Sequence, residues 1–309
     1  MKFIADSIER VDKFIADQLE EVSRSQIQEL FKSNDVFIND KPAKKQSVKL
    51  KVGDVVLVSK KGIAELNKEF ELEPELGIPL DILYEDDDIL VINKQADLIV
   101  HPTTSEPNHT LANAIIAQYP ELKDVGESPF RPGIVHRLDR NTTGVLIIVK
   151  NQKTFDFIKE QFLNHSIKKI YIALVHGVFK DKDGVINYSI RPSSINRLKK
   201  VIVKDINKEE DKRSIREAET AYKVKESIEE KYSLLEVYPK TGRTHQIRVH
   251  LAAIGHPVVG DELYGSRTNL TNRQMLHAKS IEFIAPNGKE MKIEAPIPED
   301  MQDVIKKAN

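Results

Sequence analysis

An aspartate enclosed by two arginines is the feature of this sequence best suited to chemistry. Asp139 lies in the segment RPGIVHRLDRNTTGVLIIVK (131–150), with Arg137 and Arg140 close to it on either side. A carboxylate beside guanidinium groups favours its charged form, so we expect Asp139 to be ionised. An ionised aspartate can act as a nucleophile or as an electrostatic stabiliser, but it is a poor general acid. A structural ion pair is the alternative interpretation of the same residues.

The guanidinium of Arg243 is a second candidate, in the segment LLEVYPKTGRTHQIRVHLAAIGHP (234–257). The pattern predicts a strand, a Thr-Gly turn and then a helix with Thr244 as its N-cap and Gly255 at its end. The apolar face of this helix consists of Ile247, Leu251 and Ile254. Arg243 would then stand at a strand–helix junction, where its planar group could bind a carboxylate or a phosphate.

A tyrosine on a predicted strand is the third candidate. In KKIYIALVHG (168–177) the residues Ile170, Ile172 and Leu174 share one face of the strand. Tyr171 falls on the other face with Lys169. A tyrosine beside a lysine could stack on a nucleobase, which contributes roughly 1–3 kcal/mol per stacked base. Packing against a helix is the alternative.

Other kinds of site are less well supported. No GxGxxG, GxxxxGK or GxSxG motif occurs, which removes the usual signals for dinucleotides, nucleoside triphosphates and serine esterases. A catalytic metal is disfavoured because there is no cysteine and no pair of histidines at HExxH or His-x3-His spacing. The candidate histidine ligands are His136, His245, His250, His256 and His277. A pair of carboxylates of the glycosidase type would need a partner for Asp139, and Asp261 stays open as that partner.

The elements that must position these groups divide into three regions. Residues 1–61 predict two helices and a small β-hairpin, residues 62–78 an acidic linker broken by proline and glycine, and residues 79–309 a larger domain. In the larger domain the predicted strands are 89–93, 144–149, 169–175, 233–238 and 291–295. The predicted helices are 110–118, 153–164 and 245–254, with a charged surface loop at 199–213. Because strands and helices do not alternate strictly, we expect an α+β fold with a mixed or antiparallel sheet.

Composition limits the class of protein. The 309 residues include 47 lysines and arginines against 48 acids, for a net charge of −1, which excludes a histone-like protein held to nucleic acid by its overall charge. Residues 131–180 nevertheless contain nine bases against three acids, as a site for a polyanion requires. The chain has no cysteine. With no 18-residue apolar run and no secretory signal, it is expected to be soluble and cytoplasmic.

The motifs together resemble those of the RluA-type pseudouridine synthases. The segment around Asp139 looks like the HRLD-x-x-[ST]-[ST]-G signature of that family, and the likeness continues through LYEDDDILVINK (83–94), YIALVHG (171–177), TGRTHQIRVHL (241–251) and GHPVVGDELYG (255–265). It covers nearly all of residues 80–300 in order. Residues 1–61 resemble the small α-L RNA-binding domain, which makes the whole chain similar to the RluD/RluC subgroup.

The resemblance implies a fold, an activity and roles for named residues. The fold would be a long mixed, mainly antiparallel sheet with a central cleft, catalysing uridine isomerisation in RNA without metal or cofactor. Asp139 would be the catalytic aspartate, Arg243 the arginine that pairs with it and Tyr171 the residue that stacks on uracil. Further substrate contacts would come from Arg137, which would fill the space left by a flipped nucleotide, and from His136, Arg140, Arg131 and Lys169. RNA contacts of the N-terminal module would come from Arg24, Lys41, Lys44 and Lys45.

The resemblance also suggests partners and leaves an alternative. The substrate would be ribosomal RNA or an assembling large ribosomal subunit, and the protein a monomer that binds no membrane. The loop NKQADLIVHP (93–102) has Gln95 and Asp97 where the family usually has proline and glycine, a departure that would bear on substrate choice and not on chemistry. A non-catalytic assembly factor that binds ribosomal RNA is the alternative function, although it would not need to keep Asp139, Tyr171 and Arg243 together.

Overall fold

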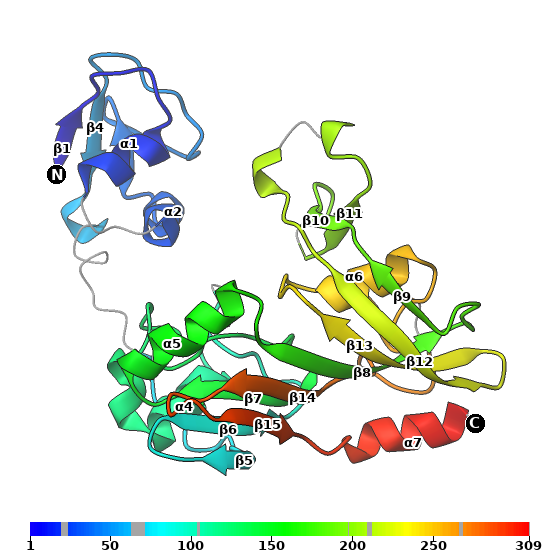
Figure 1. Ribbon diagram of the computed structural model, residues 1–309. Helices are drawn as coiled ribbons and strands as arrows, with labels where there is room; N and C mark the ends of the chain where they lie inside the picture. Colours follow the sequence, from blue (N-terminus) through cyan, green and yellow to red (C-terminus); the bar gives the residue numbers. More distant parts are fainter. Residues whose placement is uncertain are drawn as a thin grey trace. The chain divides into compact units, whose positions relative to one another are not determined.

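The computed structural model divides the chain into two compact units, Met1–Glu71 and Leu72–Asn309 (Figure 1). The described residues are 1–19, 24–62, 72–103, 106–196, 198–208, 212–265 and 268–308. Most of the expected linker, 63–71, lies outside them. Residues 72–78 are not the solvated spacer that their acidic neighbours predicted, because Leu72 and Ile78 are buried in the core of the second unit. No helix among the described residues is long and apolar enough to cross a membrane.

The first unit consists of two helices packed on a small antiparallel sheet. Its elements are β1 (Lys2–Ile4), α1 (Val11–Gln18), α2 (Arg24–Lys32), β2 (Val36–Ile38), β3 (Lys41–Pro42) and β4 (Val55–Val58). The strands are ordered β1-β4-β2-β3. The apolar positions that predicted the helices all enter one core, namely Val11, Phe14, Ile15, Leu19, Ile27, Leu30 and Phe31. Helical periodicity in the sequence therefore identified the buried face of both helices.

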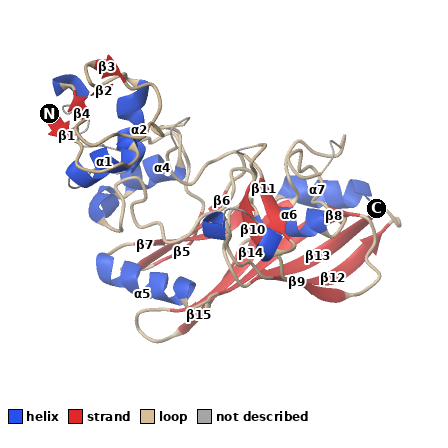
Figure 2. Ribbon diagram, turned by 90° about the horizontal axis from the view of Figure 1, so that it is seen from above, coloured by secondary structure: helices blue, strands red, loops and turns tan. Residues whose placement is uncertain are grey.

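A nine-stranded mixed sheet forms the second unit (Figure 2). Its strands are β5 (Ile82–Glu85), β6 (Ile89–Lys94), β7 (Thr143–Val149), β8 (Lys168–His176), β9 (Asp183–Ile186), β12 (Thr220–Ile228), β13 (Tyr232–Pro239), β14 (Leu276–Ile284) and β15 (Glu290–Glu294). They are ordered β5-β6-β7-β14-β8-β13-β12-β9, with β15 beside β14. The one parallel pairing is β7 with β14, so the expected mixed, mainly antiparallel sheet is confirmed.

Helices cover both faces of this sheet (Figure 1). They are α4 (Leu111–Gln118), α5 (Gln152–Leu163), α6 (Gln246–Ala253) and α7 (Glu299–Ala308), with 3-10 turns η1 (Pro120–Asp124), η2 (Ile206–Lys208) and η3 (Lys212–Ser214). On β6 and β7, α4 packs on one set of alternate residues and α5 on the other set. In the same way, α6 and α7 pack on opposite sets of alternate residues of β8. The three helices predicted in the larger domain, 110–118, 153–164 and 245–254, are confirmed as α4, α5 and α6 within one residue at each end.

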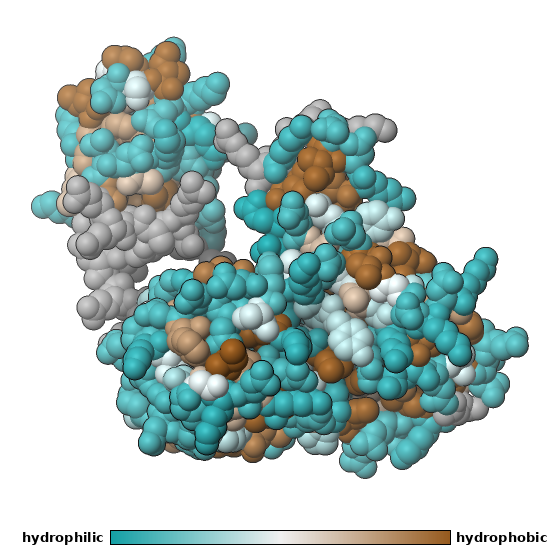
Figure 3. Space-filling model, in the orientation of Figure 1, coloured by the Kyte–Doolittle hydropathy of each residue, from teal (hydrophilic) through white to brown (hydrophobic). Residues whose placement is uncertain are grey.

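The expected charged loop at 199–213 is partly a strand. Strands β10 (Ser189–Pro192) and β11 (Lys200–Val203) pair as a separate two-stranded sheet. The lysines of this stretch suggested a loop, but Val201, Ile202 and Val203 are β-branched and favour the extended conformation. Near the turn between the strands, Ile195 is 97% exposed and Leu198 is 74% exposed. Figure 3 shows hydrophobic surface on the upper part of the second unit, the part that contains β10 and β11.

Candidate active site around Asp139

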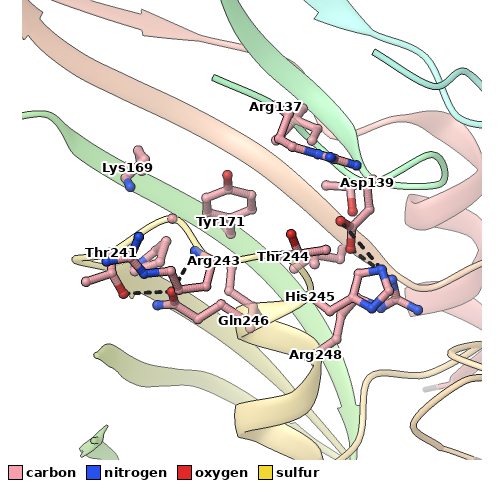
Figure 4. Close-up of a pocket in the computed structure, with 16 residues that line it drawn as sticks. Arg137, Asp139, Lys169, Tyr171, Thr241, Arg243, Thr244, His245, Gln246 and Arg248 are labelled. Carbon is pink, nitrogen blue, oxygen red and sulfur yellow. Dashed lines mark hydrogen bonds and ion pairs between the residues drawn. The ribbon is translucent and has the colours of Figure 1, made fainter. Parts of the chain in front are cut away.

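A pocket lies at the middle of the large sheet, where the chain enters β7 beside β14 (Figure 4). Gly144, which pairs with Ala278, permits the close approach of these two strands: its φ is +112°, and a Cβ there would lie 2.2 Å from the Ala278 carbonyl oxygen. The pocket is lined by the loop before β7, by β8, by the β13–α6 connection and by the first residue of β14. Its lining residues are Arg137, Leu138, Asp139, Thr142, Lys169, Tyr171, Pro239, Thr241–Arg248 and Leu276.

Asp139 pairs with Arg248, not with Arg243. The Arg248 Nη1 group donates to Asp139 Oδ2 at 2.9 Å, and Figure 4 shows Arg248 beside the carboxylate with Arg243 on another side of the pocket. Arg243 is exposed at the pocket wall, and its Nε donates to the Glu217 carbonyl oxygen at 3.1 Å. The expected pairing is therefore corrected. Arg248 falls in the first turn of a predicted helix, where the helix dipole disfavours a cation, but the sequence does not show that Asp139 is the carboxylate that balances it.

Asp261 holds the other edge of the same guanidinium. Arg248 donates from Nε at 2.6 Å and from Nη2 at 2.9 Å to the two oxygens of Asp261, and the Tyr264 ring lies 5.3 Å from its guanidinium carbon. Burial opposes the charge of Arg248, but its hydrogen bonds and the charges of the two aspartates raise its pKa above the ordinary value. The result is a permanent cation between two carboxylates. Asp261 thus reaches Asp139 through an arginine and does not face it as a glycosidase partner would.

The second oxygen of Asp139 is less constrained. His245 Nε2 lies 3.9 Å from Asp139 Oδ1, beyond hydrogen-bond length. His245 Nδ1 lies 3.0 Å from the Tyr264 hydroxyl, which accepts the Lys200 backbone N–H at 2.7 Å. Burial lowers the pKa of His245, so the ring is neutral near pH 7. Since the Tyr264 proton then has His245 Nδ1 as its acceptor, we assign the ring proton to Nε2, the atom facing Asp139.

The turn before α6 differs from the predicted cap. His245, not Thr244, is the N-cap residue, with a left-handed φ of 58° and no side-chain cap. Gln246 takes over the local hydrogen bonding: its Oε1 accepts from the Thr241 hydroxyl at 2.7 Å and from the Arg243 backbone N–H at 3.0 Å, while its Nε2 donates to the Glu219 carbonyl oxygen at 2.9 Å. This rigid turn presents both His245 and Arg248 to the pocket.

Tyr171 and Lys169 occupy the wall formed by β8, as their shared strand face predicted. Tyr171 sits in register with Ala278 of β14 and Val237 of β13, at the middle of the sheet. Burial and the nearby charge of Asp139 raise the pKa of Tyr171 well above its ordinary value, so its hydroxyl keeps its proton at neutral pH. Burial lowers the pKa of Lys169 to about 8, which leaves this amine mostly protonated at pH 7.

Arg137 presents positive charge at the pocket, whereas Arg131 is not among the residues that line it. Arg137 lines the pocket and is exposed. Arg131 donates from Nη2 to His101 Nε2 at 3.0 Å. Burial, together with the charges of both arginines, lowers the pKa of His101 to about 4, so the neutral ring can accept that hydrogen bond. His101, which the sequence did not single out, thus orients Arg131.

Two other expected substrate contacts are engaged elsewhere. His136 accepts the Ile147 backbone N–H at its Nε2 atom, at 2.9 Å, and its ring stacks on Phe162 with centroids 4.8 Å apart. Arg140 pairs with Glu106 and lies 3.4 Å from Asp97. Neither residue is among those that line the pocket. His136 therefore braces β7, and two carboxylates already balance Arg140.

A buried lysine supports the loop of Asp139 and was missed by the sequence reasoning. Lys94, at the end of β6, is 1% exposed. Its Nζ donates to the carbonyl oxygens of Gln95, Leu98 and Arg140 at 2.7, 2.8 and 2.9 Å. Burial lowers its pKa to about 7. These three hydrogen bonds tie residues 95–98 to the backbone that follows Asp139 directly.

Three of the four basic residues expected to bind RNA in the first unit lie at its surface. Lys41, Lys44 and Lys45 are exposed. Lys44 and Lys45 line a shallow hollow whose other members are Arg10, Phe31, Lys32, Gln46 and Ser47. Arg24 belongs to α2, but its side chain lies outside the described part of the chain.

Both units match known protein families. Residues 88–253 match the RNA pseudouridylate synthase family, and residues 9–56 match the S4 domain. The first match contains the pocket residues from Arg137 to Arg248.

Similar proteins agree with these matches over nearly the whole chain. An uncharacterized RNA pseudouridine synthase of Bacillus subtilis, YlyB, is 36% identical over 96% of this chain and 93% of its own length. The ribosomal large subunit pseudouridine synthase D of Salmonella typhimurium is 36% identical over 96% of this chain and 90% of its own length.

A solved structure agrees as well. The human RNA pseudouridylate synthase domain containing 1 superposes with a TM-score of 0.56 at 28% identity, covering 72% of this chain and 86% of that one. The aspartate, arginine and tyrosine of the pocket thus belong to a scaffold shared with enzymes of this type. The chain is a member of the RNA pseudouridine synthase family, with an S4 domain at its N-terminal end.

Proposed function

We propose that this protein converts specific uridines of large-subunit ribosomal RNA to pseudouridine, with Asp139 as the essential group. Family membership supports the reaction class. Similarity over 96% of the chain to a protein named ribosomal large subunit pseudouridine synthase D supports the ribosomal substrate. The S4 unit supports RNA as the partner. Action on free or assembling ribosomal RNA, and the monomeric state expected from the sequence, belong to the same proposal.

The proposed reaction exchanges one bond to the ribose for another. The N1–C1′ bond of uridine breaks, the uracil turns within the pocket and a C5–C1′ bond forms. C5 then loses its proton and N1 gains one, so that the product is an isomer of uridine. Asp139 would either attack C1′ or remove the proton on C2′. Both routes need a carboxylate oxygen that is free to approach the sugar. Because Arg248 binds Oδ2 and no hydrogen bond among the described residues occupies Oδ1, Oδ1 is the oxygen we assign to this step.

The base would be held by the wall opposite the reacting sugar. A uridine stacked in a helix cannot reach the pocket, so the nucleotide must flip out at a cost of a few kcal/mol. Tyr171 would stack on the free uracil and retain it between bond cleavage and bond formation. Arg137, exposed at the pocket, would offset part of the cost by filling the space that the nucleotide leaves. Arg131, Lys169 and Arg243 would bind the RNA backbone as cations.

The observation that carries the proposal is the geometry of Asp139, a carboxylate fixed at one oxygen and open at the other inside a cationic pocket. Tritium release from RNA labelled at C5 of uridine tests it. Wild-type protein is expected to release tritium without added cofactor, and the Asp139→Asn variant to release none while still binding the RNA. Release by Asp139→Asn at the wild-type rate would remove Asp139 from the mechanism. RNA binding without release by the wild type would indicate the non-catalytic assembly factor.

A further inference from the structure

We infer that Asp261 is a positioning residue that sets how Arg248 meets Asp139. Asp261 takes one edge of the guanidinium, so that a single N–H remains aimed at Asp139 and Oδ1 of Asp139 stays open. This inference rests on the proposed role of Asp139. It concerns a residue in the turn between α6 and β14, which does not itself line the pocket.

The hydrogen bonds divide the guanidinium between the two aspartates. The Nε and Nη2 groups of Arg248 point at Asp261, at 2.6 and 2.9 Å, and Nη1 points at Asp139 at 2.9 Å. Arginine binds carboxylates preferentially through two parallel N–H groups. If Asp261 did not occupy one edge, Arg248 could turn and bind both oxygens of Asp139. The reactive oxygen would then be held in a hydrogen bond.

Asp261 is itself fixed by the backbone around it. It is 1% exposed, and its Oδ1 accepts the backbone N–H groups of Leu263 and Tyr264 at 3.0 and 3.2 Å. The turn depends on Gly260, whose φ is +77° and where a Cβ would lie 2.0 Å from the Arg273 carbonyl oxygen. A buried carboxylate held by two backbone hydrogen bonds can impose one orientation on its arginine partner.

The charges favour the same arrangement, in which Arg248 binds both Asp261 and Asp139. Arg248 lies in the first turn of α6, where the helix dipole disfavours a cation. Two carboxylates on one guanidinium leave the group of three with one net negative charge. Asp139 therefore keeps its charge available for the sugar, although its partner is a buried arginine. Removing the charge of Asp261 would leave Arg248 to attract Asp139 alone.

Tritium release by Asp261→Asn tests the inference, with Asp300→Asn as the matched control. Asp300 accepts two hydrogen bonds from Arg273, at 2.6 and 2.8 Å, in the same side-on geometry but without reaching Asp139. We expect Asp261→Asn to lower kcat on the order of 10-fold to 100-fold, with KM close to that of the wild type. The acidic limb of the profile of kcat against pH should also move to lower pH, because the negative charge of Asp261 is removed. Asp300→Asn should leave kcat and the position of that limb unchanged.

A second arm asks whether Asp261 acts through Arg248. In an Arg248→Lys background the planar guanidinium that bridges the two aspartates is already absent, so adding Asp261→Asn should change kcat little. If Asp261→Asn folds and leaves kcat and the acidic limb unchanged, or lowers kcat by the same factor in both backgrounds, the inference is overturned.

If Asp261→Asn does not fold, the Asp261→Glu variant provides the test. Glutamate keeps the charge but displaces Arg248, so kcat should fall without a shift of the acidic limb. An unchanged kcat in Asp261→Glu would overturn the inference. Failure of the proposed function is separate, because it would appear as no tritium release by the wild type or as release by Asp139→Asn at the wild-type rate.

Discussion

The Nη1 group of Arg248 donates to Oδ2 of Asp139 at 2.9 Å across 109 residues of sequence. The two residues come from different elements, the loop before β7 and the first turn of α6. Thr143 of β7 pairs with His277 of β14, so the parallel strands bring the loop to the middle of the sheet. The contact therefore depends on the complete second unit and not on a local motif.

Arginine-to-lysine substitutions should separate Arg248 from Arg243. Lysine keeps the charge but cannot bridge two carboxylates, so Arg248→Lys should lower kcat by at least about 10-fold. Arg243 is exposed and bonds to a backbone carbonyl, so Arg243→Lys should leave kcat within about twofold, since a lysine still binds phosphate as a point charge. Steady-state tritium release measures both variants. A larger loss of kcat in Arg243→Lys would mean that Arg243 contributes more to the reaction than a positive charge at the pocket wall.

Substitutions of Tyr171 should distinguish its ring from its hydroxyl. Its pKa is raised by burial and by Asp139, so a phenolate base at neutral pH is disfavoured and stacking is the role we assign. Tyr171→Phe should keep most of kcat/KM. Tyr171→Ala should lose about 1–3 kcal/mol of base stacking, or roughly 5-fold to 150-fold in kcat/KM. If Tyr171→Phe were as impaired as Tyr171→Ala, the hydroxyl would be needed for the reaction.

The outcome for Arg243 shows how far the sequence could predict the site. The segment 241–251 was identified correctly, and Ile247 and Leu251 are buried as its helical pattern predicted. The pattern could not show which arginine faces Asp139, because that depends on the left-handed turn at His245. A left-handed conformation is uncommon for a residue other than glycine, and no local pattern signals it here.

The elements missed in the fold have a similar cause. Strand β14 contains the buried polar residues His277 and Ser280 and is covered on both faces for most of its length, so it lacks the alternation that identifies a half-exposed strand. The C-terminal helix α7 has a readable apolar stripe in Met301, Val304 and Ala308, but it was not predicted. The recovered strands include β6 and β7, which are continuous apolar runs buried on both faces. The long-range contacts between elements were not predicted.

His136 should make the protein less stable in acid. Burial lowers its pKa to about 3, from 6.5 in an unfolded chain. The unfolded state therefore binds more protons between pH 6.5 and about 3, and the free energy of unfolding falls as the pH falls through that range. Below about pH 3 both states are protonated and this contribution stops changing. Denaturant titrations from pH 7 to pH 4 should show a weaker pH dependence for His136→Gln than for the wild type.

The comparison at His136 has an internal control. His165 lies in a turn after α5 and is exposed, so His165→Gln should leave the pH dependence of unfolding as it is in the wild type. Glutamine at 136 can still accept the Ile147 N–H through its amide oxygen. Equal pH dependence in His136→Gln and the wild type would mean that folding does not lower the pKa of His136.

Charge reversal in the S4 unit should weaken RNA binding without touching the chemistry. Lys44 and Lys45 line the hollow of that unit together with Arg10 and Lys32, and a lysine that neutralises a phosphate releases a counterion. The double variant Lys44→Glu/Lys45→Glu should bind RNA more weakly and lower the slope of log Kd against log salt by about one for each phosphate that is no longer neutralised. The kcat of the double variant at saturating RNA should match the wild type.

Lys13→Glu, which replaces a lysine lying 3.4 Å from Glu9, is the control and should keep most of the affinity and the salt slope. If the double variant kept both as well, the S4 unit would not anchor this RNA through these two lysines.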